Sequence, residues 1–250
     1  MTPETSVLTP AYNSESYLAE TIDSVIAQSF KNWEMIIVDD CSDDETLNIA
    51  RRYSENDERI RVIANTENAG TAQSRNRAIE NARGRYIAFL DSDDVWLPEK
   101  LARQLEFMQT GKLAFSYTAY RRISDDGNRV GRLITVPEIL DYQTLLKNTA
   151  ITNSTVMIDT QKIRNVHMPD QNIEDYVCWL EIARRGSIMR GLNEDLLRYR
   201  VTAGSRSRNK LKHAGYVWHI YREIEKLNLW KACWSFMNYA VRGVIKYLRF

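Results

Sequence analysis

The chain has 250 residues, of which 44% are hydrophobic and 27% charged. This length suits one α/β domain, or a domain with an appendage, and the composition excludes disordered, fibrous and disulfide-rich classes of protein. The net charge is +1, but residues 206–250 hold ten Lys/Arg and two Glu, a net +8 that leaves −7 on residues 1–205. A basic segment on an acidic body predicts contact with an anionic surface, and we expect no nucleic-acid partner.

Cysteine usage and the N-terminus indicate the compartment. Cys41, Cys178 and Cys233 lie far apart without CxxC spacing, which predicts free thiols in a reducing compartment. No basic region followed by an apolar run opens the chain, so we expect no signal peptide. No uninterrupted run of about 18 apolar residues occurs, so we expect no membrane span. The expected location is the cytoplasm, with peripheral attachment to the inner face of the cell membrane as the alternative.

The first half of the chain alternates short apolar stretches with amphipathic ones. We expect strands at residues 6–9, 33–38, 60–64 and 86–90 and helices at about residues 14–29, 43–53 and 71–82. Ser42 and Glu45 have the spacing of a capping box for the second helix. Strands that alternate with helices predict a parallel sheet.

Polar clusters follow three of these strands. They are TPAYN at residues 9–13, the pair Asp39 and Asp40, and DSDD at residues 91–94. In a parallel sheet all three fall on the same edge, where ligands bind. Crowded carboxylates repel one another, and Mg²⁺ or Mn²⁺ bound by them and by nucleotide phosphates relieves that repulsion. The alternative is a solvated acidic turn.

After about residue 98 the pattern changes to a mixed α+β extension that we expect to cover the ligand edge. Expected helices span residues 97–108 and 173–185, and expected strands span residues 113–120, 155–158 and 196–201, with a hairpin turn at residues 125–128. Glu174 and Asp175 stand in the first turn of the later helix. This divides the chain into halves 1–97 and 98–205 of one domain, 1–205, and a tail, 206–250.

The end of the tail predicts an amphipathic helix over residues 229–250. Its polar residues recur at spacings of three and four, which places them on one stripe: Lys231, Ser235, Asn238, Arg242, Lys246 and Arg249. A wide apolar face with a basic stripe and aromatic residues favours an anionic membrane surface. A helical hairpin packed on the first domain, or in a homo-oligomer, is the alternative.

Five motifs in order resemble those of the family 2 glycosyltransferases. They are TPAYN at 9–13, IIVDDCSDD at 36–44, NAGTAQSRN at 68–76, the DxD element in FLDSD at 89–93, and Glu-Asp at 174–175. The resemblance covers roughly residues 5–205. It implies the GT-A fold of nucleotide-diphospho-sugar transferases, a Rossmann-like mixed sheet flanked by helices, here with a C-terminal helical extension.

The resemblance also implies residue roles. The nucleotide site would comprise Thr9, Pro10, Ala11, Tyr12, Asp40, Arg75, Asp91 and Ser92. Asp40 would accept a hydrogen bond from uracil N3–H, which selects uridine over cytidine. Asp93 would ligate Mn²⁺ or Mg²⁺ directly, with Asp91 at the ribose or a metal-bound water. Asp175 would be the catalytic base, with Glu174 orienting it or the acceptor; ordinary first-turn acids are the alternative.

The function so implied is inverting, metal-dependent transfer of a sugar from a UDP-sugar to a glycan, a lipid-linked saccharide in cell-surface polysaccharide biosynthesis. Metal at the leaving group and one base opposite it suit a single displacement. One alternative is a non-catalytic sugar-nucleotide-binding or membrane-scaffold subunit of a polysaccharide assembly complex. Nucleotidyl transfer ranks last, because no Gly-rich phosphate loop follows the first strand.

Overall fold

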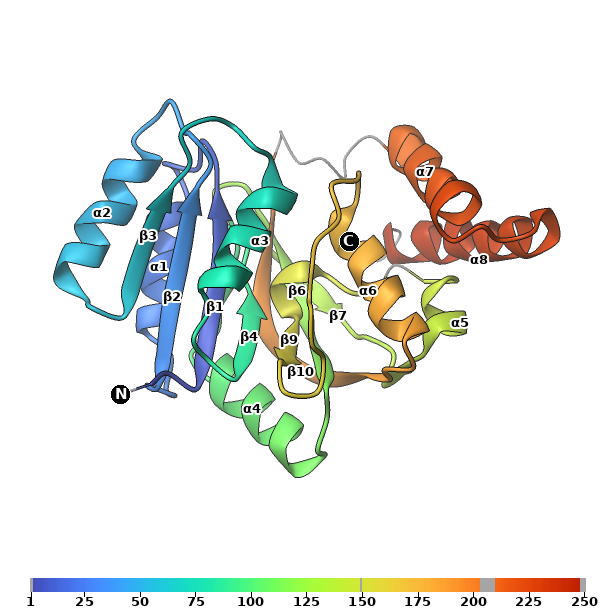
Figure 1. The fold of residues 1–250 in the computed structure, drawn as a ribbon, viewed down its shortest axis with the longest axis horizontal. Helices are drawn as coiled ribbons and strands as arrows, with labels where there is room; N and C mark the ends of the chain where they lie inside the picture. The colour runs from blue at the N-terminus through green and yellow to red at the C-terminus, as the bar shows by residue number, and fades with distance from the viewer. Residues whose placement is uncertain (1, 149, 203–209, 248–250) are drawn as a thin grey trace.

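A single sheet runs through the molecule. The computed structural model describes residues 2–148, 150–202 and 210–247. Within these residues ten strands form one sheet of order β3-β2-β1-β4-β9-β6-β10-β5, with β7 paired to β6 and β8 to β10 (Figure 1). The expected α/β class, with a mixed sheet flanked by helices, is confirmed.

The bounds of the elements are as follows. The strands are β1 (Thr5–Ala11), β2 (Trp33–Asp39), β3 (Ile60–Ala64), β4 (Tyr86–Phe89), β5 (Val95–Trp96), β6 (Phe115–Ser124), β7 (Val130–Ile134), β8 (Ile139–Leu140), β9 (Met157–Asp159) and β10 (Met189–Val201). The helices are α1 (Leu18–Ile26), α2 (Thr46–Asn56), α3 (Thr71–Asn81), α4 (Lys100–Thr110), α5 (Tyr142–Leu145), α6 (Glu174–Arg184), α7 (Lys210–His219) and α8 (Leu229–Tyr247). Short 3₁₀ and π-helical segments are η1 (Asn153–Thr155) and η3 (Ile220–Ile224).

The first half forms the parallel part of the sheet. β2 pairs in parallel with β1 and β3, and β1 pairs in parallel with β4. Every residue of β1, β2 and β4 is buried, as their apolar runs predict for strands covered on both faces. The carboxyl ends of these strands therefore bring the three polar clusters to one edge.

The second half continues the same sheet rather than only covering it. β9 inserts antiparallel to β4, β6 pairs antiparallel to β9, and β10 runs parallel to β6. β10 starts at Met189, seven residues before the predicted strand. Its first part contains Gly191, where a Cβ would lie 2.2 Å from the carbonyl oxygen of Pro137, and its pairing with β6 shifts register twice. Because this part of β10 contains a glycine and polar residues, it lacks the apolar pattern that predicts a strand.

Of two smaller predictions, the structure confirms one and contradicts the other. The hairpin turn at residues 125–128 is confirmed between β6 and β7, and Gly127 has φ of 73° there. The capping box at Ser42 and Glu45 is wrong. α2 begins at Thr46 without a side-chain cap from Glu45, and the Ser42 hydroxyl instead accepts a hydrogen bond from Asn13 N.

Helices cover both faces of the sheet. Buried residues of α1, α2 and α4 belong to one apolar cluster, and those of α3, α5, α6 and α7 belong to another. Trp179 of α6 anchors this helix to the sheet, because its ring packs edge-on against Phe89 of β4 at 5.5 Å and Phe115 of β6 at 5.0 Å. This packing fixes the N-terminus of α6 near the carboxyl end of β4.

The C-terminal helices pack against α5 and α6 on the side of the molecule far from β3 (Figure 1). The buried Tyr221 hydroxyl donates to Leu146 O and lies 3.2 Å from the Tyr176 hydroxyl. The predicted boundary at residues 205–206 and residues 248–250 lie outside the described residues, as do the side chains of residues 242–247. In the part of the chain that is described, no helix has both the length and the apolar character to cross a bilayer.

α8 presents its apolar face outward. Its exposed side chains recur along one side of the helix: Leu229, Trp230, Trp234, Met237 and Val241. The predicted polar stripe faces the rest of the molecule at two of its positions, since Ser235 is buried and Lys231 lies over the Tyr142 ring at 5.7 Å.

Candidate active site

The acidic loop after β4 is fixed by residues of η1. Asp91 N donates to the Ser154 hydroxyl at 3.0 Å, and Asp91 Oδ1 accepts from Asn153 Nδ2 at 3.0 Å. Neither Asn153 nor Ser154 was predicted from the sequence, because an Asn-Ser pair in a loop carries no motif. η1 lies beside Asp91 because β9, which follows η1, pairs with β4, and this long-range pairing has no local sequence signal.

Arg75 of α3 joins the two acidic motifs. Its Nη2 donates to Asp91 Oδ1 and its Nη1 to Glu174 Oε1, each at 2.5 Å. Its side chain is 4% exposed. Burial alone would lower the pKa of Arg75, but the charges of Asp91 and Glu174 outweigh it and raise the pKa above its usual value. The guanidinium is therefore a fixed positive charge between residues that lie 16 and 99 positions away.

Glu174 and Asp175 follow a strained turn at the start of α6. Ile173, which precedes α6, has φ of 61° and ψ of 50°, a left-handed conformation that is unfavourable for a β-branched side chain. Such strain persists only where surrounding packing holds it, and Ile173 packs against the apolar cluster that contains Trp179. The turn aims two adjacent acids at the same edge of the sheet.

Asp175 has the electrostatic character of a general base. Burial raises its pKa first, the neighbouring Glu174 charge raises it further, and Arg75 opposes both, which leaves a pKa of about 6. Its Oδ1 accepts a hydrogen bond from Tyr176 N at 2.8 Å. A carboxylate with this pKa is ionised at neutral pH and is still basic enough to accept a proton.

Asp40 holds the loop that leads into α3. Its Oδ1 accepts hydrogen bonds from Asn65 Nδ2 at 2.7 Å and Ala69 N at 2.9 Å, and its Oδ2 accepts one from Gly70 N at 2.8 Å. Gly70 has φ of 87°, a conformation open to glycine. Asp40 thus sets the position of the α3 N-terminus, from which Arg75 projects.

The predicted nucleotide-site residues at the end of β1 differ in exposure. Thr9, Pro10 and Ala11 are buried within the strand, whereas Tyr12 is 47% exposed. Ser92 turns toward α1, since its hydroxyl lies 2.7 Å from the Ser14 hydroxyl. Of this group only Tyr12 offers a large side chain to the space above the strand ends.

Arg200 of β10 ties down Asp93 and Asp94. Its Nε donates to Asp93 O at 2.9 Å, its backbone N to Asp94 Oδ1 at 2.9 Å, and its Nη1 to Asp125 O at 2.8 Å. Burial and the charges of Asp93 and Asp91 hold the pKa of Asp94 well above its usual value. Arg200 therefore fixes this loop through the main chain of Asp93 and the side chain of Asp94.

Among the described residues, no three His, Cys, Asp or Glu side chains come together as a metal site. Asp91 and Asp93 supply two carboxylates with hard oxygen donors, and Mg²⁺ or Mn²⁺ commonly completes such a set with phosphate and water oxygens. The donor chemistry of this loop fits a divalent cation whose remaining ligands come from a bound nucleotide.

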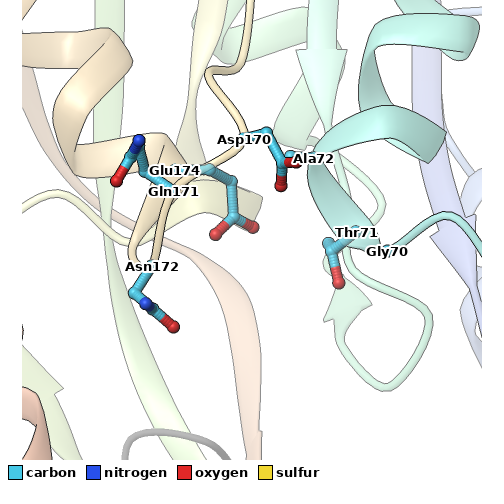
Figure 2. Close-up of a pocket in the computed structure, with 7 residues that line it drawn as sticks. All are labelled: Gly70, Thr71, Ala72, Asp170, Gln171, Asn172 and Glu174. Carbon is cyan, nitrogen blue, oxygen red and sulfur yellow. The ribbon is translucent and has the colours of Figure 1, made fainter.

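A cavity of about 290 Å³ opens beside Glu174, the one predicted site residue among those that line it. It lies between the N-terminus of α3 and the turn before α6, and its lining residues are Gly70, Thr71, Ala72, Asp170, Gln171, Asn172 and Glu174. Figure 2 shows the Glu174 carboxylate lying between Asn172 on one side and Thr71 on the other. The cavity therefore connects the acidic turn of α6 with the loop that Asp40 holds.

Solved structures share this fold. S. aureus TarS in complex with UDP superposes with a TM-score of 0.68 at 21% identity, over 88% of this chain and 66% of that chain. The mannosyltransferase PcManGT from Pyrobaculum calidifontis, in complex with GDP-Man and Mn²⁺, gives a TM-score of 0.65 at 17% identity, over 91% of this chain and 66% of that chain. These likenesses concern the fold, which is that of GT-A glycosyltransferases.

Sequence comparison is more specific. TuaG of Bacillus subtilis, a glycosyltransferase assigned to teichuronic acid biosynthesis, is 47% identical over 98% of both chains. WfaP of Escherichia coli, a UDP-Glc:α-D-GlcNAc-diphosphoundecaprenol β-1,3-glucosyltransferase, is 39% identical over 97% of this chain and 94% of its own. The family model described as glycosyl transferase family 2 matches residues 6–168. This match and these identities show that the chain belongs to glycosyltransferase family 2.

Proposed function

We propose that the chain is an inverting, divalent-metal-dependent transferase that moves a sugar from a UDP-sugar to a lipid-linked saccharide in surface polysaccharide biosynthesis. The observation that carries this proposal is the pair of hydrogen bonds from Arg75 to Asp91 and Glu174. That pair brings a donor-side acid and the helix with the candidate base to one edge of the sheet. The name of the relative WfaP supports a lipid-linked acceptor, and the name of TuaG supports a role in polysaccharide biosynthesis.

In the proposed reaction Asp175 accepts the proton of the acceptor hydroxyl. The hydroxyl oxygen forms a bond to the anomeric carbon while the bond from that carbon to the donor phosphate oxygen breaks, and the nucleoside diphosphate leaves. One base opposite one leaving group gives inversion. Glu174 keeps Arg75 in place, and Arg75 in turn limits the rise in the pKa of Asp175.

Asp93 and Asp91 are the residues that would hold the cation. A divalent ion there would neutralise the charge that develops on the departing diphosphate. Arg200 supports this arrangement from outside the site, because it fixes the main chain of Asp93 and the side chain of Asp94.

Asp40 and Tyr12 are the proposed contacts to the base. A carboxylate offers about four lone-pair sites, and Asp40 uses three of them for the loop, so one remains for uracil N3–H. The exposed Tyr12 ring offers a face for the base. PcManGT shares the fold but was solved with GDP-Man, so the fold alone does not fix which nucleotide binds. Nucleotide selectivity therefore requires a direct measurement.

The outward apolar face of α8 is proposed to lie on a lipid surface. Two exposed tryptophans on this face suit the headgroup region of a bilayer, and a lipid-linked acceptor gives such contact a purpose. Vesicles of phosphatidylglycerol should sediment the wild-type chain but not the Trp230→Ser, Trp234→Ser variant. Concentration-dependent dimers of the wild type that the variant loses, without sedimentation, would assign the face to a second copy instead.

The experiment for the proposed function is calorimetric titration of UDP, CDP and GDP with Mn²⁺ and with EDTA. UDP should bind at least about tenfold, or about 1.4 kcal/mol, more tightly than CDP and GDP. Binding should weaken in EDTA and in Asp93→Ala, while Glu55→Gln, an exposed acid on α2, should behave as wild type.

Turnover separates the enzyme from a binding subunit. A panel of UDP-sugars with alkyl-diphosphate-linked saccharides should yield a product whose anomeric configuration, read by NMR, is opposite to that of the donor. UDP binding without turnover, in a chain whose Asp175→Asn variant still supports polysaccharide assembly in cells, would make the chain a non-catalytic subunit.

A further inference from the structure

A second cavity adjoins the first. Its volume is about 310 Å³, and it is lined by Gln171 and Asn172 on one side and by Tyr216, His219 and Ile220 on the other. Gln171 and Asn172 also line the cavity that contains Glu174. The two cavities therefore share a wall, and the second lies on the side of the acidic turn that α7 covers.

The lining of this second cavity suits a neutral, polyhydroxylated ring. It combines two side-chain amides, an imidazole, a phenol ring and one aliphatic side chain, and no Lys, Arg, Asp or Glu among the described residues lines it. An aromatic face with a few hydrogen-bonding groups is typical of small-ligand sites of about this size. A pyranose presents an apolar C–H face and a rim of hydroxyls that match this lining. The nearby cation Lys212 lies over the Tyr216 ring, 5.8 Å from its centroid, and does not line the cavity.

The walls of the cavity are held by the packed core. On the α7 side, Val217 and Tyr221 are fully buried, and Trp218 packs edge-on against Phe236 of α8 at 5.5 Å. The adjoining segment η3 is π-helical, a form that often marks functional sites. On the other side, the left-handed Ile173 fixes the turn that carries the two amides.

We propose that this second cavity is an acceptor subsite that binds the terminal pyranose of the acceptor glycan, with Tyr216 and His219 as specificity-determining residues. The inference rests on the proposed transferase function and deepens it. Tyr216 stacks on the apolar face of the ring, while His219, Gln171 and Asn172 bond its hydroxyls. The ring so placed extends the acceptor from the wall shared with the Glu174 cavity toward α7, which packs on α8. These residues lie beyond residues 6–168, the part of the chain that the family model matches.

The test compares Tyr216→Ala, Tyr216→Phe and His219→Ala with the wild type. The matched control is Glu223→Ala, an exposed residue on η3 outside the cavity whose carboxylate pairs with Lys226. Each protein is assayed for UDP affinity, for acceptor-independent hydrolysis of the UDP-sugar, and for KM toward a panel of alkyl-diphosphate-linked mono- and disaccharides. Unfolding temperatures confirm that the variants fold.

Tyr216→Ala and His219→Ala should raise the acceptor KM about tenfold or more, the effect of losing about 1.4 kcal/mol of binding, with donor hydrolysis and UDP affinity unchanged. Tyr216→Phe should keep most of the acceptor affinity, because the stacking face remains. An acceptor KM equal to that of Glu223→Ala would overturn the subsite. A wild type that binds no UDP would instead overturn the transferase function, so the two failures are distinct.

Discussion

At the residue scale, Arg75 is the charge around which the site is arranged. It is buried between Asp91 and Glu174, and neither hydrogen bond is local in sequence. Without it, the half-buried Asp91 and the buried Glu174 would lose their shared cationic partner, and Glu174 would face a desolvation cost. The same guanidinium lowers the pKa of Asp175, so one side chain contacts the proposed donor-side acid and tunes the proposed base.

The pKa of Asp175 predicts the acid limb of activity. Because the base must be ionised, kcat/KM should fall as the pH decreases through about 6. Asp175→Asn should lower kcat by about a hundredfold or more, since general-base catalysis contributes at least that much. A pH–rate series on the wild type and this variant measures both. An acid limb that persists unchanged in the residual activity of Asp175→Asn would assign it to another group.

The same carboxyl predicts a gain in stability from its removal. A folded-state pKa raised above the unfolded value of about 3.9 favours folding at low pH, and this contribution is lost as the pH rises through about 6. Asp175→Asn should therefore be more stable than wild type at neutral pH by roughly 1–2 kcal/mol, with a Tm rise of about 2–4 °C per kcal/mol. The difference should shrink toward pH 4, as thermal unfolding across this range would show.

Arg75→Met should shift the acid limb of the pH–rate profile to higher pH. Loss of the guanidinium removes the interaction that lowers the pKa of Asp175, so the limb should move to higher pH. Breaking a buried ion pair from one side should also cost about 3–5 kcal/mol of stability. Arg75→Lys is the control, because it keeps a charge but cannot donate to both carboxylates in Arg75 geometry. If all three proteins share one acid limb, Arg75 does not tune the base.

The acids of the site could be named from the sequence, but their partners could not. Asp91, Asp93, Glu174 and Asp175 stand at strand and helix ends, where residue type and position together indicate chemistry. Asn153 pairs with Asp91 only because β9 inserts beside β4, a long-range event without a local signal.

At the element scale, β10 is the strand that closes the site from the second half. Arg200 near its end reaches the acidic loop, the turn at Asp125 and Glu20 of α1. Its guanidinium also lies 5.2 Å from the Tyr17 ring. A single strand thus holds the candidate metal-binding loop against two other elements.

Arg200→Met should loosen that loop. The loss of the hydrogen bonds that the buried Arg200 side chain donates to the carbonyl oxygens of Asp93 and Asp125 should cost about 2–4 kcal/mol in urea unfolding and weaken Mn²⁺-dependent UDP binding. Arg198→Met, on the same strand, should cost less than about 1 kcal/mol, because its ion pair with Asp195 is more exposed. Equal losses in the two variants would show that Arg200 has no special role in the loop.

Elements were predictable where the local pattern was strong. The alternating strands and helices up to residue 90 and the turn at residues 125–128 follow from apolar periodicity and turn chemistry. The first half of β10 was not predictable, since Gly191 serves a close approach to Pro137 that only the folded chain reveals. The sequence predicted that α8 has an apolar face but not that this face points outward, because that depends on which side of α8 packs against α7.

At the scale of the whole molecule, the C-terminal helices belong to the core. Val217, Ile220 and Tyr221 lie in the same apolar cluster as Trp179 of α6. The net charges of the body and the tail differ in sign, yet the described contacts between them are mainly apolar packing, with a few hydrogen bonds such as that from Tyr221 to Leu146 O. α7 and η3 are therefore part of the catalytic unit rather than an attached tail.

Truncation should show this difference. A chain ending at residue 202 exposes the cluster that Val217, Ile220 and Tyr221 cover, at about 1.5–3 kcal/mol per side chain, which approaches the total stability of a domain. It should lose cooperative thermal unfolding. A chain ending at residue 228 keeps η3 and should unfold cooperatively at a moderately lower Tm. Cooperative unfolding of the shorter chain at the wild-type Tm would contradict the packing described above.

The distribution of tryptophan gives the protein a built-in optical reporter. Trp33, Trp96 and Trp179 are buried and Trp218 is half-buried, whereas Trp230 and Trp234 are exposed on one face of α8. A water-soluble collisional quencher such as acrylamide should extinguish mainly the emission of these last two. Whatever covers that face should shift their emission to the blue and shield them from the quencher, so intrinsic fluorescence can follow occupancy of α8 without any label.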